Sequence, residues 1–163
     1  PIYAGGHIAL LVAGPLVQVC AVEENLVALL LLLVGDDPIY AGLHEYQVHG
    51  SVYGVIPAKR IKHKPLGEWS YEEIRVVGDH ITVTVNGEVI VDGDVRKACQ
   101  GHNVDPNGSD KNPYTVDHRN HPGMFNKTGH IGFLGHGAGV KFRNVRVLDL
   151  TAQKQAKKGK ARR

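Results

Sequence analysis

The chain has 163 residues, a length that fits one domain of ordinary size and leaves no room for two full cores. Glycine contributes 20 residues, well above its usual share of about 7%, whereas only 21% of the residues are charged and 6% are aromatic. This turn-rich composition excludes a coiled coil and a disordered chain. It favours many short strands over a helical bundle.

The formal net charge of +3 originates in the C-terminal tail. Six of the 19 Lys and Arg lie in residues 151–163, which contain no acidic residue, so residues 1–150 hold 13 basic and 16 acidic residues. We expect residues 1–150 to form a single domain and residues 151–163 to be a disordered basic tail. The tail has no aromatic side chain to stack on a base, so no specific nucleic-acid recognition is expected.

The N-terminal third is dominated by two apolar stretches, at residues 8–22 and 26–34. The second contains nine consecutive apolar residues, whereas a bilayer span needs about 20, so both stretches predict buried strands and no membrane span. The chain opens without a basic segment or a small-residue cleavage site, so no signal peptide is expected within it. Cys20 and Cys99 are too few for a disulfide framework.

Strand signals dominate from residue 48 onward. Residues 73–77 and 81–85 are rich in β-branched side chains, and Asn86-Gly87 separates the second run from residues 89–91. Asn-Gly between two such runs predicts a hairpin with a type I′ turn, whose two central residues need positive φ. The apolar residues of the middle strand should face the core, because successive side chains of a strand alternate between its faces.

A last strand is predicted over residues 140–148, where a bulge would decide which face Arg143 and Asn144 occupy. Between the two strand blocks, residues 96–127 are rich in Asn, Asp, Pro, Gly and His. This composition predicts a long irregular excursion, and long loops of that kind usually carry function.

The excursion contains two groups of side chains that could bind a metal ion. His118 and His121 lie beside Asp117, but this spacing in a loop matches no fixed zinc geometry, so solvated histidines are the favoured interpretation. Residues 105–110 are rich in oxygen ligands for calcium but lack the EF-hand order. An ordinary turn is favoured there.

Residues 129–139 contain many glycines and two histidines. A phosphate-binding loop would need a helix after it, whereas a strand follows here, so the glycines favour tight turns and bulges. His136 lies at such a turn, where its imidazole could reach a cleft.

Several segments of the chain match the sequence of one protein family, and they occur in the same order as in that family. They are residues 37–43, 49–60, 67–73, 121–125, 129–133 and 143–146. Through them the chain resembles the 3-keto-disaccharide hydrolase domain family over residues 36–150. The resemblance implies an all-β fold, an antiparallel concanavalin-like jelly-roll β-sandwich, whose concave side binds an oligosaccharide or glycoside. It also implies a periplasmic or secreted protein.

The resemblance further implies that the chain cleaves glycosidic bonds of sugars oxidised to a ketone at carbon 3. The ketone acidifies the hydrogen on carbon 2, so a base can remove it, the glycosidic oxygen leaves, and water then adds to the enone. We expect His49 or Glu68 to serve as the base or a metal ligand, Lys59 to stabilise the enolate, and Tyr53 and His136 to contact the sugar. The same chemistry allows a divalent metal, which the sequence does not identify.

Residues 1–35 differ from the family pattern. Leu29 and Leu31 stand where the pattern places polar side chains that point into the cleft. The alternative is therefore a non-catalytic carbohydrate-binding β-sandwich module. In either case we expect His49 and His136 to line one cavity, and Trp69 to be largely buried.

Overall fold

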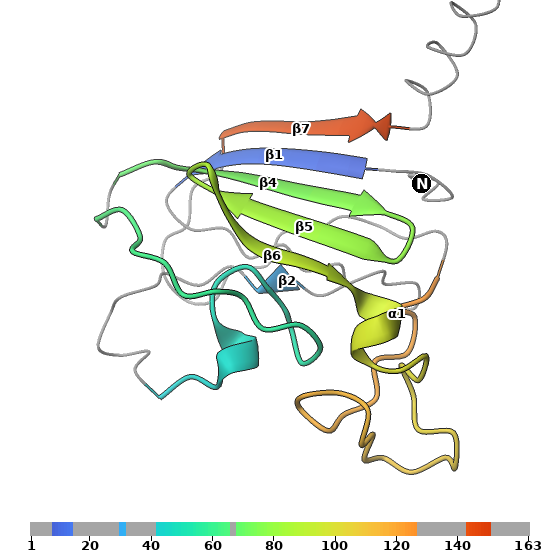
Figure 1. Ribbon diagram of the computed structural model, residues 1–163. Coiled ribbons are helices and arrows are strands. Elements are labelled where there is room, and N and C mark those ends of the chain that lie inside the picture. The colour runs from blue at the N-terminus through green and yellow to red at the C-terminus, as the bar shows by residue number, and fades with distance from the viewer. Residues whose placement is uncertain (1–7, 15–29, 32–41, 66–67, 127–142, 151–163) are drawn as a thin grey trace, which may run out of the picture.

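The computed structural model describes residues 8–14, 30–31, 42–65, 68–126 and 143–150. These residues are built mainly from antiparallel strands, with little helix, which confirms the all-β prediction (Figure 1). The predicted tail, Cys20 and His136 lie outside the described residues. No helix within the described ranges is long and apolar enough to cross a membrane.

The main element is a five-stranded sheet in the order β6-β5-β4-β1-β7, in which all neighbours are antiparallel. Its strands are β1 (Ile8–Gly14), β4 (Ser70–Val77), β5 (His80–Val85), β6 (Glu88–Asp94) and β7 (Arg143–Asp149). A second, two-stranded sheet pairs β2 (Leu30–Leu31) with β3 (Ser51–Val52). Both apolar N-terminal stretches thus contribute a strand, as predicted.

The β5–β6 hairpin forms as the sequence predicts. Asn86 and Gly87 both have positive φ, +49° and +89°, as a type I′ turn requires. Ile81, Val83 and Val85 of β5 face the core and are 2%, 0% and 1% exposed. Because these three side chains are almost completely buried, this face of the hairpin forms one side of the hydrophobic core.

The core lies between the buried face of this hairpin and two segments that connect the strands. The cluster consists of apolar residues from β4, β5 and β6, from the segment 48–58 and from the excursion: Val48, Val52, Val55, Ala58, Ile74, Ile81, Val83, Val85, Ile90, Val91, Val95 and Met124. In Figure 1 the segment 42–64 (cyan to green) and the residues after α1 (Val95–Ala98) both lie below β6. Residues far apart in the sequence therefore meet on one side of the sheet.

A β-bulge sets the register of β7 against β1. Leu11 pairs with Arg146 and Ala13 with Arg143, so one additional residue is accommodated on β7 between these pairs. Asn144 takes φ +54° there. The bulge places both arginines opposite odd-numbered residues of β1, and hence on the same face of the sheet.

The excursion after α1 is irregular, as predicted, apart from one β-bridge between Lys111 and Arg119. Polar side chains hold it together. Asn112 is fully buried, and its Nδ2 atom donates to the carbonyl of His102 at 2.9 Å. The Asp105 carboxylate accepts the backbone N–H groups of residues 107 and 109, so this stretch is an ordinary turn whose carboxylate is already occupied.

Candidate active site

His49 lies at a buried position in the turn that leads into β3. Its Nε2 atom is 3.9 Å from Oε2 of Glu72, and its ring meets the ring of His63 edge to face, with centroids 4.8 Å apart. The structure therefore places this predicted residue beside a carboxyl group. The carboxyl belongs to Glu72 and not to the predicted Glu68.

Glu72 lies on the inner face of β4, paired with Val85 of β5. Its Oε1 atom is buried and has no hydrogen-bond partner among the described residues. Burial raises the pKa of Glu72 well above its usual range, because the interior disfavours the charged form. A titratable group with a strongly shifted pKa and a specific partner is a candidate functional residue.

Aromatic rings line the 3-10 helix η2 (Glu45–Gln47) and the turn after β3. His44 stacks on Tyr46 with ring centroids 5.2 Å apart, and Tyr46 meets Tyr53 edge to face at 5.6 Å. The Nε2 atom of Gln47 donates to the Tyr53 hydroxyl at 3.2 Å. Such rings with a polar partner suit the apolar faces and hydroxyls of a sugar, and the sugar-contacting role of Tyr53 stays a prediction.

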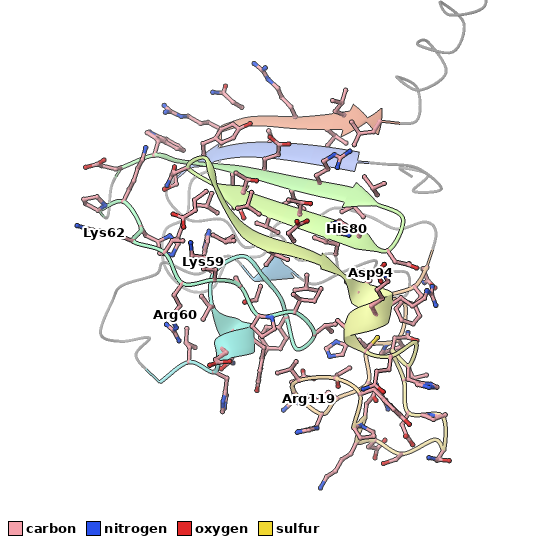
Figure 2. All side chains as sticks on the ribbon, in the orientation of Figure 1. Lys59, Arg60, Lys62, His80, Asp94 and Arg119 are labelled. Carbon is pink, nitrogen blue, oxygen red and sulfur yellow. The ribbon has the colours of Figure 1, made fainter. Side chains whose placement is uncertain are left out.

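The backbone of Lys59 is held by a hydrogen bond, whereas its side chain points outward. Its N–H donates to the carbonyl of Ile90 at 2.8 Å, whereas its Nζ atom pairs with Oε1 of Glu88 at 2.5 Å. The side chain is 65% exposed, and Figure 2 shows it on the same segment as Arg60 and Lys62. The predicted role in enolate stabilisation would require Lys59 to exchange Glu88 for the substrate.

The remaining predicted residues lie apart from this cluster or outside the described part of the chain. Glu68 is exposed just before β4. Trp69 is intermediate in exposure, which is compatible with the prediction that it is largely buried, and the Arg143 guanidinium lies 3.9 Å from its ring centroid. The pairing of His49 with His136 stays a prediction, because residue 136 is not described.

A second titratable pair lies against the backbone of Gly54. Nε2 of His121 is 3.1 Å from Oδ1 of Asp117, whose side chain is only 2% exposed. The excursion docks here because the backbone N–H of Val116 donates to the carbonyl of Gly54 at 2.8 Å. The sequence favoured a solvated loop histidine at position 121, whereas the His121 ring is mostly buried and lies against the Asp117 carboxylate.

Two pairs of titratable groups thus lie at the segment 49–54, one at each end of it. No set of three His, Cys, Asp or Glu side chains among the described residues lies close enough to hold a metal ion. Sequence reasoning missed Glu72 because its position on β4 follows the same alternation as the core residues around it. Asp117 and His121 were singled out as possible metal ligands, but their contact with Gly54 was not predicted, because nothing in the spacing shows that the loop packs against that residue.

Comparison with known proteins places the chain in a family. Residues 34–148 match the family described as the 3-keto-alpha-glucoside-1,2-lyase-like domain. A 3-keto-disaccharide hydrolase from Bacteroides thetaiotaomicron is 29% identical in an alignment of 131 positions that covers 68% of this chain. The chain spans 45% of the length of that relative.

Crystal structures of two proteins from Parabacteroides distasonis, assigned as glycosyl hydrolases, share the fold. The first has a TM-score of 0.67 and 22% identity, over 88% of this chain and 78% of the other. The second has a TM-score of 0.58 and 19% identity, over 90% and 72%. The all-β antiparallel architecture therefore extends to these two solved structures.

Proposed function

The chain belongs to the 3-keto-alpha-glucoside-1,2-lyase-like domain family, and from this premise we propose that it cleaves 3-keto-glycosides by elimination followed by hydration. The name of the B. thetaiotaomicron relative supports the substrate class. The buried pair of His49 and Glu72 is the observation in the described residues that carries the proposal, because it places a carboxyl group whose pKa is raised by burial next to an imidazole.

The reaction has two balanced steps. In the first, a base takes the proton from carbon 2, the C–H electron pair forms the double bond between carbons 1 and 2, and the glycosidic oxygen leaves with a proton from an acid. In the second, the hydroxyl of a water molecule adds to carbon 1 and a proton adds to carbon 2. The site must therefore supply one proton acceptor and one proton donor.

We assign the donor side to His49, with Glu72 behind it as the proton source. Burial raises the pKa of the Glu72 carboxyl and so favours its protonated form, from which a proton would pass to His49 when that ring gives its own proton to the leaving oxygen. Tyr53 would hold the sugar through its ring and its hydroxyl, and Gln47, which donates to that hydroxyl, would orient it.

Lys59 would stabilise the enolate oxygen that forms at carbon 3. Leaving Glu88 costs little, since an ion pair between exposed side chains contributes only about 0–1 kcal/mol. The substrate oxyanion would then replace the Glu88 carboxylate as the anion that Lys59 binds.

The test uses the protein with methyl 3-keto-α-glucoside, and measures methanol release and the ultraviolet absorbance of the enone, with and without divalent cations. We expect turnover by the unmodified protein and a loss of about 100-fold or more in kcat for His49→Gln, the usual contribution of acid–base catalysis. His80→Gln is the matched control, because His80 is exposed on the sheet and pairs with Asp92. Oligosaccharide binding without cleavage under all conditions would instead favour the carbohydrate-binding module.

A further inference from the structure

We infer that His121 is a second catalytic residue of this site, the base that removes the hydrogen from carbon 2 of the 3-keto sugar, and that Asp117 positions its ring. This inference rests on the proposed function, which requires a proton acceptor in addition to the donor assigned to His49. Neither the family match nor the relatives assign a role to these two residues.

The geometry of the pair fixes which ring nitrogen is available. Oδ1 of Asp117 lies 3.1 Å from Nε2 of His121, and a carboxylate accepts, so the proton of the neutral ring resides on Nε2. The lone pair of the ring is then on Nδ1. A carboxylate that holds an imidazole in one tautomer, and stabilises the imidazolium that forms, is the arrangement of a general base.

The backbone around the pair is held on several sides. The N–H of His121 donates to the carbonyl of Asn103 at 2.7 Å, and Nδ2 of Asn103 donates back to the carbonyl of His121 at 2.9 Å. Oδ1 of Asp117 also accepts the N–H of Arg119 at 3.0 Å. The residue between them in the loop, His118, takes φ +56°, a left-handed conformation that costs a non-glycine residue energy.

Burial of the Asp117 side chain is also unfavourable, because one of its two oxygen atoms is left without a hydrogen bond among the described residues. Its Oδ2 atom is buried and has no hydrogen-bond partner within the part of the chain that the structure describes. A buried polar atom without a partner is unfavourable and needs an explanation such as catalysis. If the loop only had to be stable, a side chain with fewer polar atoms would serve better.

The pair also lies where a sugar-binding segment can present the substrate. Gly54 carries the contact with the pair and directly follows Tyr53, the ring proposed to hold the sugar. The side chain of His121 is 18% exposed, whereas that of Asp117 is 2% exposed, so the imidazole is the member that can reach a ligand. His49 lies at the other end of the same segment, which supplies the second group that elimination needs.

In the resulting step, Nδ1 of His121 forms a bond to the hydrogen on carbon 2, and the C–H electron pair passes into the enolate. The enolate then expels the glycosidic oxygen, which takes its proton from His49. His121 ends as an imidazolium next to the Asp117 carboxylate. When water adds to the double bond, its hydroxyl bonds to carbon 1, the proton on His121 returns to carbon 2, and the other proton of the water returns to His49, so the protein is regenerated without an added reactant.

The experiment compares two substrates that differ in the leaving group, methyl and 4-nitrophenyl 3-keto-α-glucoside. Nitrophenolate leaves without a proton, so loss of the donor in His49→Gln should slow only the methyl glycoside. Loss of the base in His121→Gln should lower kcat by about 100-fold or more on both substrates. His118→Asn is the control, because His118 is exposed three residues away and asparagine tolerates its positive φ.

Asp117→Asn preserves the shape of the side chain but cannot hold the ring in the same tautomer. We expect kcat to fall on both substrates, and nitrogen-15 NMR of the ring to show Nε2 protonated in the unmodified protein but mixed tautomers in this variant. Unreduced turnover of the 4-nitrophenyl substrate by His121→Gln would overturn the inference.

The NMR measurement also separates this inference from the proposed function. If the unmodified protein cleaves neither substrate, the proposed function fails together with the catalytic role of His121. A ring protonated on Nδ1, in a protein that does cleave the substrates, would overturn the base assignment alone.

Discussion

His49 and Glu72 face each other across the interior of the protein, with Nε2 and Oε2 3.9 Å apart and both side chains almost fully buried. Each group would be penalised for carrying a charge there, because burial disfavours the charged form of both acids and bases. The pKa of Glu72 is raised for this reason. Stability and activity of the protein should therefore both depend on the protonation of this one carboxyl group.

The first prediction concerns the pH dependence of stability. In the folded state Glu72 keeps its proton at a pH where the unfolded chain has lost it, so its contribution is fully present below the ordinary glutamate pKa of about 4.3 and is lost as the pH rises through the folded pKa. Within this window the free energy of unfolding should fall by up to about 1.4 kcal/mol per pH unit. Glu72→Gln should remove that slope, as measured by urea denaturation from pH 4 upward.

Glu68→Gln provides the control for this measurement. Glu68 is exposed two residues before β4, so its replacement should leave the slope as in the unmodified protein. Parallel stability curves for Glu72→Gln and the unmodified protein would show that burial does not shift this carboxyl, and would also remove the support it gives to His49.

The second prediction separates the structural role of Lys59 from its chemical role. Lys59→Met removes the ion pair with Glu88, whose side chains are 65% and 48% exposed, and should change the free energy of unfolding by less than about 1 kcal/mol. If Lys59 stabilises the enolate, kcat should fall by about 100-fold, as for the loss of one donor to an oxyanion. Glu88→Gln releases the same ion pair but leaves the lysine free, so its kcat should not fall.

A third prediction tests the packing of the hairpin against the core. Ile81 is 2% exposed on β5. Ile81→Ala should lower the free energy of unfolding by about 2–5 kcal/mol, because it leaves a cavity in the core. Val89 lies on the paired strand of the same hairpin but is 49% exposed, so Val89→Ala should cost less than about 1 kcal/mol. Equal losses in chemical denaturation would contradict the assigned faces of the hairpin.

Local patterns made much of the fold predictable. Asn86 and Gly87 set the turn and the alternation of Ile81, Val83 and Val85 set the face, and both act between residues close in the sequence. The bulge in β7 could be anticipated only as an alternative, because its position depends on pairing with β1, about 130 residues away in the chain.

The candidate site was less predictable for the same physical reason. His49 could be singled out from the family pattern, but its partner Glu72 lies on a strand whose alternation predicts core residues. Only the packing of the segment 48–58 against the core residues of the five-stranded sheet brings the two together. The pair of Asp117 and His121 depends on a loop that docks through backbone hydrogen bonds to Gly54, which no side-chain pattern records.

The last prediction concerns that docking contact. Gly54 has φ +72°, and a Cβ atom added there would lie 2.3 Å from Oδ2 of Asp117 and 2.7 Å from Nε2 of His121. Gly54→Ala should therefore cost about 1–2 kcal/mol for the left-handed backbone and about 1–3 kcal/mol more for overpacking against the pair. Gly78→Ala is the matched control, because Gly78 also has positive φ, +62°, but a Cβ there would meet nothing within 4 Å.

The two glycine variants should also differ in the state of the pair. Only Gly54→Ala should displace Asp117 from His121, so it should change the tautomer of the His121 ring seen by nitrogen-15 NMR and lower kcat on both 3-keto-glycosides. Gly78→Ala should lose only the stability that its backbone conformation accounts for. If denaturation gave the same loss for both variants and the His121 ring were unchanged in both, Gly54 would be an ordinary turn residue, and the pair would not depend on the absence of its side chain.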